Sequence, residues 1–410
     1  MAIATVTAPA SVSATASINF QSAHHLKLQQ LRQQANDRYL EREEEITGIL
    51  TCLLSGEHAV LLGDPGTGKS YMVGGILGAF QGSYFQWLMT RFTKDDELFG
   101  PVKMSGLKND KLERNTFGRL PEANMAFLDE VFKANSSVLN ALLTILNEKV
   151  YYNDGTPVKA PLQTLIGASN ELPEEGEGLA ALYDRFVLRY WVNPLERDSS
   201  WETLMLRTSG VSATPQITVS ISQAELALLQ KEAQAVTFNA ETISVLKELR
   251  SLLRNENIII SERRWVKLIG IVKAFAYLNG ESEATEDHFS ILVHSLWSDK
   301  DQIREIKRII GKVGNPLAQK ANEILKAARE EVAKLDVISK ADTAGEMQWM
   351  GQATITLQAL TSMITELDVI IASAKTTNRA KAPKQAKQEI ERISRKLGTE
   401  ASSWFGAKIK

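Results

Sequence analysis

The fold of this chain is decided by one stretch, Gly63-Asp64-Pro65-Gly66-Thr67-Gly68-Lys69-Ser70. It fits the spacing G-x-x-x-x-G-K-[ST], and it lies between an apolar run at 58–62 and a helical pattern at 71–80. A strand that turns sharply into a helix points several backbone N–H groups at one spot, where the helix dipole favours anions. The stretch therefore predicts a phosphate cradle, in which Lys69 reaches the β- and γ-phosphates and Ser70 ligates Mg²⁺.

Apolar runs and helical patterns alternate on both sides of this stretch. Strand-like runs occupy residues 58–63, 83–90, 124–129, 161–168 and 186–192. Because helical patterns such as 136–148 separate the strands, the chain is expected to form a parallel sheet. We predict an α/β fold in which a five-stranded parallel sheet carries helices on both faces.

The strand signals fade from about residue 194, and helical patterns follow at 222–236, 241–254, 261–279 and 285–298. A second break at Gly311 to Pro316 precedes long helical patterns up to residue 397. The sequence therefore predicts four parts: a disordered leader over 1–22, an α/β core over 23–194, a helical lid subdomain over 195–310, and a helical extension with a basic tail over 311–410.

Three polar residues follow apolar strands at the edge where ligands bind in open α/β sheets. Asp129 and Glu130 end the run at 124–129, where Asp129 is suited to hold Mg²⁺ through water and Glu130 to polarise an attacking water. Asn170 ends the run at 164–169 and can help set the line of attack on the γ-phosphate. Taken singly, each position also fits an ordinary polar turn at the end of a strand.

Composition narrows the class of protein. The net charge is −2, but it is unevenly distributed: residues 1–300 carry 28 basic and 36 acidic side chains, whereas residues 375–410 carry ten basic and three acidic ones. The acidic first 300 residues argue against nucleic acid as the main partner. The basic tail fits contact with an acidic partner, nucleic acid or anionic lipid, or a solvated helix surface. The single cysteine, Cys52, suits a reducing interior, and we expect a cytoplasmic protein. No run of eighteen apolar residues occurs, so no transmembrane helix is expected.

Several ordered blocks carry a resemblance to a known family. The chain resembles AAA+ ATPases of the MoxR family, and within it the RavA (regulatory ATPase variant A) subgroup, over roughly residues 35 to 300. The matching blocks are Leu88–Phe92, Glu97–Pro101, Gly118–Ala123, Phe127–Glu130, Leu139–Thr144, Asn147-Glu148, Ala168–Pro173, Leu182–Phe186 and Ser261–Trp265. The resemblance implies an AAA+ P-loop NTPase core followed by a helical lid, with ATP and Mg²⁺ as cofactors.

The resemblance also implies roles for single residues. The stretch 63–70 corresponds to Walker A, Asp129 and Glu130 to Walker B, and Asn170 to sensor 1. Arg185 corresponds to an arginine finger, which reaches the γ-phosphate bound in a neighbouring subunit.

In the lid, the resemblance places sensor 2, which contacts phosphate, at Arg263, with Arg264 as the adjacent competitor. Without the resemblance, Arg185 reads as one half of a surface ion pair with Asp184, and Arg263 reads as a solvated helix charge. The family pattern further places a helix-2 insert at 99–114 and a hairpin at 149–160, which face the pore or a partner in such rings.

The resemblance implies a hexameric ring, and we expect this chain to hydrolyse ATP in such a ring to remodel or mature a client protein. Members of the family commonly work with a von Willebrand factor A-type co-protein, and we expect one here. This chain has no Asp-x-Ser-x-Ser run, so we expect that module on a separate protein. The β-rich insertion of the RavA subgroup has no counterpart in the helical patterns after residue 300. An alternative is a nucleotide-gated assembly scaffold with incidental turnover, and a third is nucleic-acid handling. The client, the pathway, the symmetry and the role of the tail are not predicted by the sequence.

Overall fold

The computed structural model of the chain describes residues 18–108, 110–173, 177–314, 316–336, 338, 343–374 and 377–408. The chain divides into two compact units, Met1–Ile243 with Asn257–Ile303, and Ser244–Glu256 with Arg304–Lys410. The first unit holds the predicted core together with most of the predicted lid, so the boundary at 194 stays a prediction. Most of the predicted leader lies outside the described residues.

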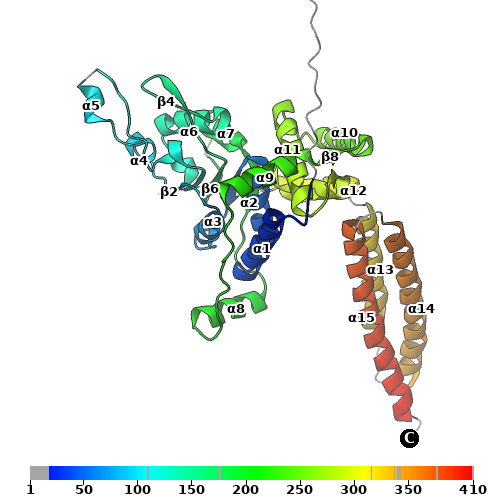
Figure 1. Cartoon of the computed structure of the whole chain (residues 1–410). Helices are drawn as coiled ribbons and strands as arrows, with labels where there is room; N and C mark the ends of the chain where they lie inside the picture. The colour runs from blue at the N-terminus through cyan, green and yellow to red at the C-terminus, as the bar shows by residue number, and fades with distance from the viewer. Residues whose placement is uncertain are drawn as a thin grey trace, which may run out of the picture. The chain divides into compact units, whose positions relative to one another are not determined.

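The first unit is built around a parallel sheet of five strands (Figure 1). Its strands are β1 (His58–Leu62), β2 (Tyr84–Leu88), β3 (Met125–Asp129), β6 (Thr164–Ser169) and β7 (Phe186–Trp191), in the order β2-β3-β6-β1-β7. Every residue of β1 is buried, as expected for an apolar strand in the middle of a parallel sheet. The prediction of a five-stranded parallel sheet is confirmed.

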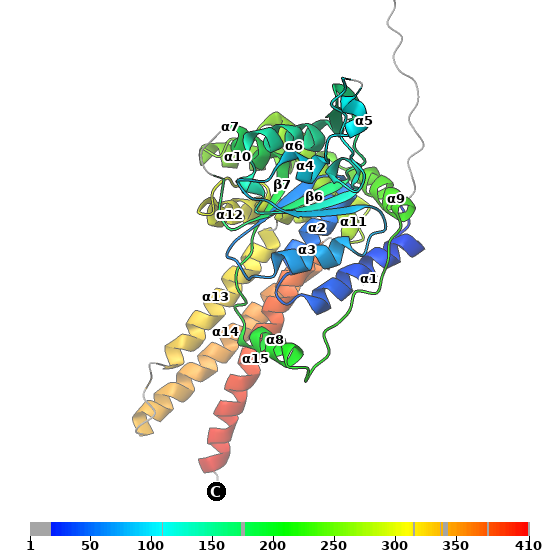
Figure 2. The same cartoon turned by 90° about the vertical axis from the view of Figure 1, so that its left-hand side faces the viewer.

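Helices cover both faces of this sheet. Figure 2 shows α6 (Ser136–Glu148) and α7 (Glu177–Arg185) on one face, with α2 (Glu43–Ser55) and α3 (Lys69–Leu77) on the other. The helix α6 begins at an Asn135 cap, whose side chain accepts a hydrogen bond from the Val138 amide. This two-faced packing buries the interior strands β1 and β6 completely, while the edge strand β2 is only partly buried.

The predicted insert and hairpin lie against each other. The helix α4 (Asp95–Phe99) ends where the insert begins, the insert contains α5 (Met104–Leu107), and η1 (Leu120–Glu122) follows it. The hairpin pairs β4 (Val150–Asn153) with β5 (Thr156–Lys159) in antiparallel register. Asn153 joins the two, because its Oδ1 accepts a bond of 2.7 Å from Arg114 N and its Nδ2 donates to Arg114 O at 3.1 Å.

The rest of the first unit is helical, with two departures from the sequence prediction. Its helices include α1 (Ala23–Arg38), α8 (Asp198–Thr208), α9 (Gln223–Ala235) and α11 (Glu262–Leu278). The region 285–298, predicted to be one helix, forms the 3₁₀ helix η3 (Glu286–His294), and β8 (Thr237–Phe238) pairs with β9 (Glu283–Ala284) where only helices were expected. The sequence prediction did not identify α8.

The second unit contains most of α10 (Ala240–Asn255), most of α12 (Gln302–Gly314), and the long helices that follow α12. These are α13 (Pro316–Asp336), α14 (Thr343–Ser373) and α15 (Thr377–Lys408), so the predicted helical extension is confirmed. Their buried side chains recur every seven residues, which is the spacing of helices packed along a common seam. The series are Ala321, Ala328 and Leu335; Ala353, Leu360 and Leu367; and Ile390 and Leu397.

One prediction about the second unit is not confirmed. Among the described residues, Met347–Ser373 in α14 is long and apolar enough to cross a membrane, by length and composition only. The sequence prediction counted only uninterrupted apolar residues, whereas this segment mixes apolar residues with threonines and few charges. A bundle helix with one buried face passes the same test, so the finding is weak evidence for a span.

Candidate nucleotide site

The phosphate cradle connects β1 to α3, as the sequence predicts. Gly68 caps α3 with a φ of 81°, in the left-handed region that glycine adopts without strain. Gly63 has a φ of 133°, and a Cβ there would lie 2.4 Å from the Val192 carbonyl oxygen. Only glycine therefore fits at position 63, where the loop passes close to the end of β7.

Lys69 lies at the first position of α3, and its ammonium group is folded over the loop. Nζ donates to the carbonyl oxygens of Gly63 at 2.7 Å and Asp64 at 2.8 Å. Burial lowers the pKa of Lys69, and the nearby carboxylates of Asp129 and Glu130 act in the opposite direction. The charge is thus held where the loop amides converge, which suits a polyphosphate.

Ser70 and Asp129 meet at the carboxyl end of β3. The Ser70 hydroxyl donates a hydrogen bond of 2.8 Å to Asp129 Oδ2. A hydroxyl and a carboxylate side by side supply the oxygen ligands that Mg²⁺ takes, directly or through water. The residues present therefore fit the predicted Mg²⁺ site.

Glu130 and Asn170 meet beside this pair. The Asn170 Nδ2 donates a hydrogen bond of 2.6 Å to Glu130 Oε1, and Lys133 Nζ lies 3.2 Å from Glu130 Oε2. Glu130 has a φ of 53°, which is uncommon for a residue with a side chain and is found at functional sites. It directly precedes the 3₁₀ turn η2 (Val131–Lys133), which leads the chain toward α6.

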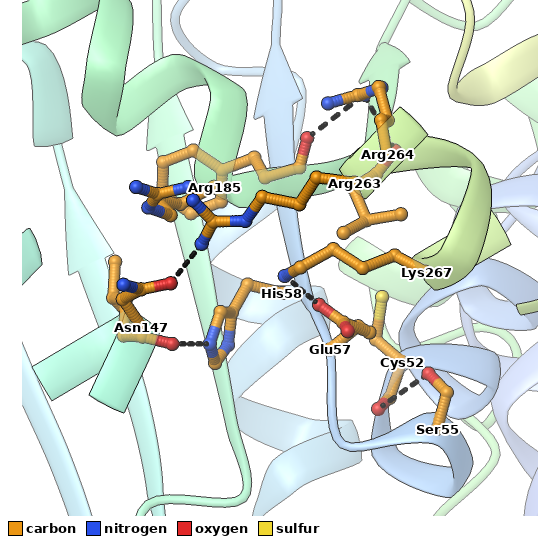
Figure 3. A network of polar contacts seen from close by, with 12 residues as sticks. Cys52, Ser55, Glu57, His58, Asn147, Arg185, Arg263, Arg264 and Lys267 are labelled. Atoms are coloured by element: carbon orange, nitrogen blue, oxygen red, sulfur yellow. Dashed lines mark hydrogen bonds and ion pairs between the residues drawn. The ribbon is translucent and has the colours of Figure 1, made fainter. Parts of the chain in front are cut away.

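Arg185 and Arg263 lie together in a second cluster (Figure 3). Arg185 ends α7, and its side chain is 15% exposed, with Asp184 Oδ2 3.8 Å from Nη1. Its Nε is buried and has no hydrogen-bond partner among the described residues. Burial lowers the pKa of Arg185, and the charge of Arg263 lowers it further. Arg263 is exposed on α11 and donates to the Asn147 amide oxygen.

Arg264, the competitor of Arg263, is buried and fully bonded. Its guanidinium donates to the carbonyl oxygens of Ser295, Asp184, Phe186 and Val187, and to the Asp184 carboxylate. These bonds use all five N–H groups of an arginine side chain. Arg264 therefore fastens α11 to β7 and has no donor left for phosphate, which leaves Arg263 as the candidate.

The sequence analysis missed a pocket of about 630 Å³ beside the phosphate cradle. One wall is the loop 64–68 with Tyr71, another is the segment 38–42, and a third is α8 with the residues around it. Arg42 links two of these walls, because its Nη2 donates to the Thr67 and Asn193 carbonyl oxygens. The only sequence signal was the aromatic and arginine content of 38–42 and 201–207, which has no fixed spacing.

Aromatic side chains shape this pocket. Trp201 and Tyr71 both line it, and they are 59% and 57% exposed. The Arg38 guanidinium lies 4.9 Å from the centre of the Tyr71 ring, and Arg207 donates to the Arg38 carbonyl oxygen. A flat heterocycle placed next to the phosphates could stack against these aromatic rings.

Two protein families match the chain. The family described as "MoxR domain in the MoxR-vWA-beta-propeller ternary systems" matches residues 26–231. The family described as "AAA lid domain" matches residues 241–310. The first match covers half of the chain and includes the cradle, Asp129, Glu130, Asn170 and Arg185. The RavA-like subgroup stays a prediction.

Three curated proteins are similar to the chain in sequence. Two uncharacterized proteins of Methanocaldococcus jannaschii are 43% identical over 316 residues (76% of this chain and 81% of that protein) and 42% identical over 314 residues (75% and 82%). A structural protein of the Acidianus two-tailed virus is 28% identical over 171 residues, which are 40% of this chain and 28% of that protein.

A solved structure shares the fold. The crystal structure of a predicted ATPase from Cytophaga hutchinsonii superposes with a TM-score of 0.57 at 18% identity, covering 71% of this chain and 95% of that one. At this identity the likeness shows the fold alone. The family matches and the geometry of the cradle lead to one conclusion. The chain belongs to the MoxR family of AAA+ ATPases.

Proposed function

We propose that this chain hydrolyses ATP at seams between its own copies and uses the cycle to remodel or mature a partner protein. The observation that carries the proposal is the separation of two clusters. In the first cluster, hydrogen bonds join Lys69 to Asn170, Asn170 to Glu130, and Ser70 to Asp129. In the second cluster, Arg185 contacts Asp184 and Arg263 contacts Asn147.

The first cluster supplies the parts for hydrolysis within one copy. A water oxygen bonds to the γ-phosphorus, the bond to the β–γ bridging oxygen breaks, and ADP leaves. Glu130 orients that water and takes its proton, while Asn170 holds the Glu130 carboxylate and Lys69 binds the phosphate oxygens. Mg²⁺, when bound near Ser70 and Asp129, neutralises charge on the transferred phosphoryl group.

The second cluster supplies positive charge to a different copy. Arg185 and Arg263 are two adjacent cations. Arg185 pairs with Asp184, but Asp184 also pairs with Arg264. An anion from outside the chain would relieve their repulsion. A γ-phosphate presented by a neighbouring copy fits that need, and arginines supplied in trans raise phosphoryl-transfer rates by about 10³–10⁵. Head-to-tail contacts of this kind close into rings, and we propose a hexamer.

The pocket beside the cradle is proposed to take the base and ribose of the nucleotide. Its volume of about 630 Å³ is in the range of small-molecule sites. The family description names von Willebrand factor A and β-propeller proteins beside the MoxR domain. We therefore propose that a separate protein with a von Willebrand factor A module works with this chain.

A mixing experiment tests shared sites. The Lys69→Ala variant loses the phosphate anchor but can still supply Arg185 to the nucleotide of a neighbouring copy. The Arg185→Ala variant binds ATP but supplies no arginine to its neighbour. Each variant alone should lose turnover. An equal mixture should recover about a quarter of the wild-type rate, because random assembly pairs an intact cradle with an intact arginine at about one seam in four.

Phosphate release from the two proteins and their mixture is the measurement, and mass photometry reports whether mixed assemblies form. Mixed assemblies without recovered turnover would refute shared sites. If wild-type protein assembles on ATP and yet turns it over slowly, with or without any partner, the scaffold alternative is favoured.

A further inference from the structure

The hydrogen bond between Asn147 and Arg263 links α6 to the neighbour-facing cations. Asn147 lies in the last turn of α6, and its Oδ1 accepts a hydrogen bond from Arg263 Nη2. Figure 3 shows the Arg263 guanidinium reaching down to Asn147 beside the guanidinium of Arg185. Both bonded side chains are exposed, so the bond adds little to stability. Its physical effect is on the direction in which the guanidinium points.

The helix that carries Arg263 is held firmly by the residues that follow it. Arg264 fastens α11 to the end of α7 and to β7 through buried hydrogen bonds. One turn further along, Lys267 Nζ lies 2.6 Å from the Glu57 carboxylate. These contacts fix the backbone at Arg263 and leave its long side chain to rotate. The contact with Asn147 selects one direction for that side chain.

The end of α6 is held as well. His58 on β1 is buried, and its Nδ1 accepts a hydrogen bond of 3.0 Å from the Leu165 amide. A neutral imidazole that accepts at Nδ1 carries its proton on Nε2, which lies 3.3 Å from the Leu146 carbonyl oxygen and donates to it. The residue before Asn147 is therefore tied to β1, an interior strand of the sheet. Asn147 is therefore held in place, and its hydrogen bond can orient the longer Arg263 side chain.

A neutral amide suits this task better than a carboxylate. Arg185 Nε is buried without a hydrogen-bond partner among the described residues, and Arg263 lies next to it. An amide oxygen can orient Arg263 without cancelling its charge, so both cations stay available to an anion. A carboxylate at the same position would keep the hydrogen bond and neutralise the guanidinium.

We propose that Asn147 is a positioning residue, which presents the Arg263 guanidinium beside Arg185 to the γ-phosphate of a neighbouring copy. The inference rests on the proposed function, since it assumes that the cation pair serves another copy. It assigns to α6 a role in hydrolysis that is distinct from its packing against the sheet.

The test is a double-mutant cycle on the full-length chain. Asn147→Ala should lower kcat roughly three- to ten-fold, as expected for loss of one hydrogen bond to a charged group at an exposed position, with KM for ATP unchanged. The double variant Asn147→Ala/Arg263→Ala should be no slower than Arg263→Ala, because Asn147 acts only through Arg263. Asn147→Asp, which keeps the hydrogen bond, should lose at least as much kcat as Asn147→Ala.

Asn140→Ala serves as the matched control, because Asn140 is an exposed asparagine on the same helix. It should keep wild-type turnover, and all five variants should keep the wild-type midpoint of thermal unfolding. Multiplicative losses in the double variant, or full activity in Asn147→Asp, would overturn the inference. Wild-type turnover in Arg263→Ala would overturn it too, while the mixing experiment with Lys69→Ala and Arg185→Ala judges the proposed function separately.

Discussion

The Asn170 amide donates a 2.6 Å hydrogen bond to the Glu130 carboxylate, and this bond joins the ends of the neighbouring strands β3 and β6. Lys133 Nζ lies 3.2 Å from Oε2, the other oxygen of the Glu130 carboxylate. Glu130 is therefore held from both sides before any substrate arrives. Such preorganisation is what a group that orients water needs.

Glu130→Gln should separate binding from hydrolysis. The amide oxygen of a glutamine can still accept the bond from Asn170, so the strand ends keep their arrangement, but the group no longer takes a proton. We expect phosphate release to fall by about 10²–10⁴-fold while ATP affinity stays within a few-fold of wild type. Titration calorimetry and phosphate release measure the two quantities. Turnover near the wild-type rate would remove Glu130 from the mechanism.

The adjacent arginines Arg263 and Arg264 should respond in opposite ways to replacement by alanine. Arg263 is exposed, so Arg263→Ala should lower turnover and leave the midpoint of thermal unfolding unchanged. Arg264→Ala leaves the carbonyl oxygens of Phe186, Val187 and Ser295 without their buried donor. It should cost on the order of 3 kcal/mol of stability. Calorimetric unfolding and phosphate release on both variants test whether Arg264 is structural and Arg263 acts in turnover. An Arg264→Ala variant that unfolds like wild type would contradict the structural role of Arg264.

Because Lys149 is partly buried, we expect the stability of the fold to depend on pH. Burial lowers its pKa to about 8, the charge of Glu57 opposes this shift, and Lys267 adds to it, while the neighbouring His58 is kept neutral because burial depresses its own pKa. Between pH 8 and the unfolded value of about 10.4, the unfolded chain binds more protons than the folded one, so stability rises with pH.

Lys149→Met removes this cost without changing the left-handed backbone at that position, where φ is 55°. The variant should be more stable than wild type at pH 7, by on the order of 2 kcal/mol, and the difference should shrink as pH approaches 10. Urea denaturation at pH 7, 8.5 and 10 measures it. A difference that grows with pH would show that Lys149 is not destabilised in the fold.

Trp201 provides a test of the base pocket. If the base stacks against this exposed ring, Trp201→Ala should weaken ATP binding roughly ten-fold, in line with the stacking energy of one base on an aromatic side chain. Inorganic tripolyphosphate should bind wild type and variant equally, because it uses only the cradle. Equal losses for both ligands would mean that Trp201 supports the loop and does not contact the base.

The parts of the structure that local sequence determines were predicted. An apolar run followed by Asp129 and Glu130, or by Asn170, encodes a buried strand that ends in a polar site, and neighbouring parallel strands bring such ends together. The positive φ values of Gly63 and Gly68 are likewise encoded by residue type.

Other parts depend on tertiary contacts and were not predicted. Nothing in the pair Arg263-Arg264 says which residue is buried, since that follows from where Ser295 and Asp184 meet α11. The pocket wall at α8 was missed because its apolar residues, including Trp201, remain exposed and show no core-facing pattern. The 3₁₀ form of η3 also differs from the helix that its apolar spacing suggested.

The helix α6 begins at Ser136, shortly after Glu130, and ends at Glu148, just past Asn147. Each residue of a helix turns the next by about 100° and advances it by about 1.5 Å. Adding or deleting one residue within α6 would swing Asn147 off Arg263 and leave Glu130 untouched. In the proposed mechanism, the residue count of this helix therefore fixes the position of Asn147, which orients Arg263 toward a neighbouring copy, relative to Glu130, which acts on the nucleotide of its own copy.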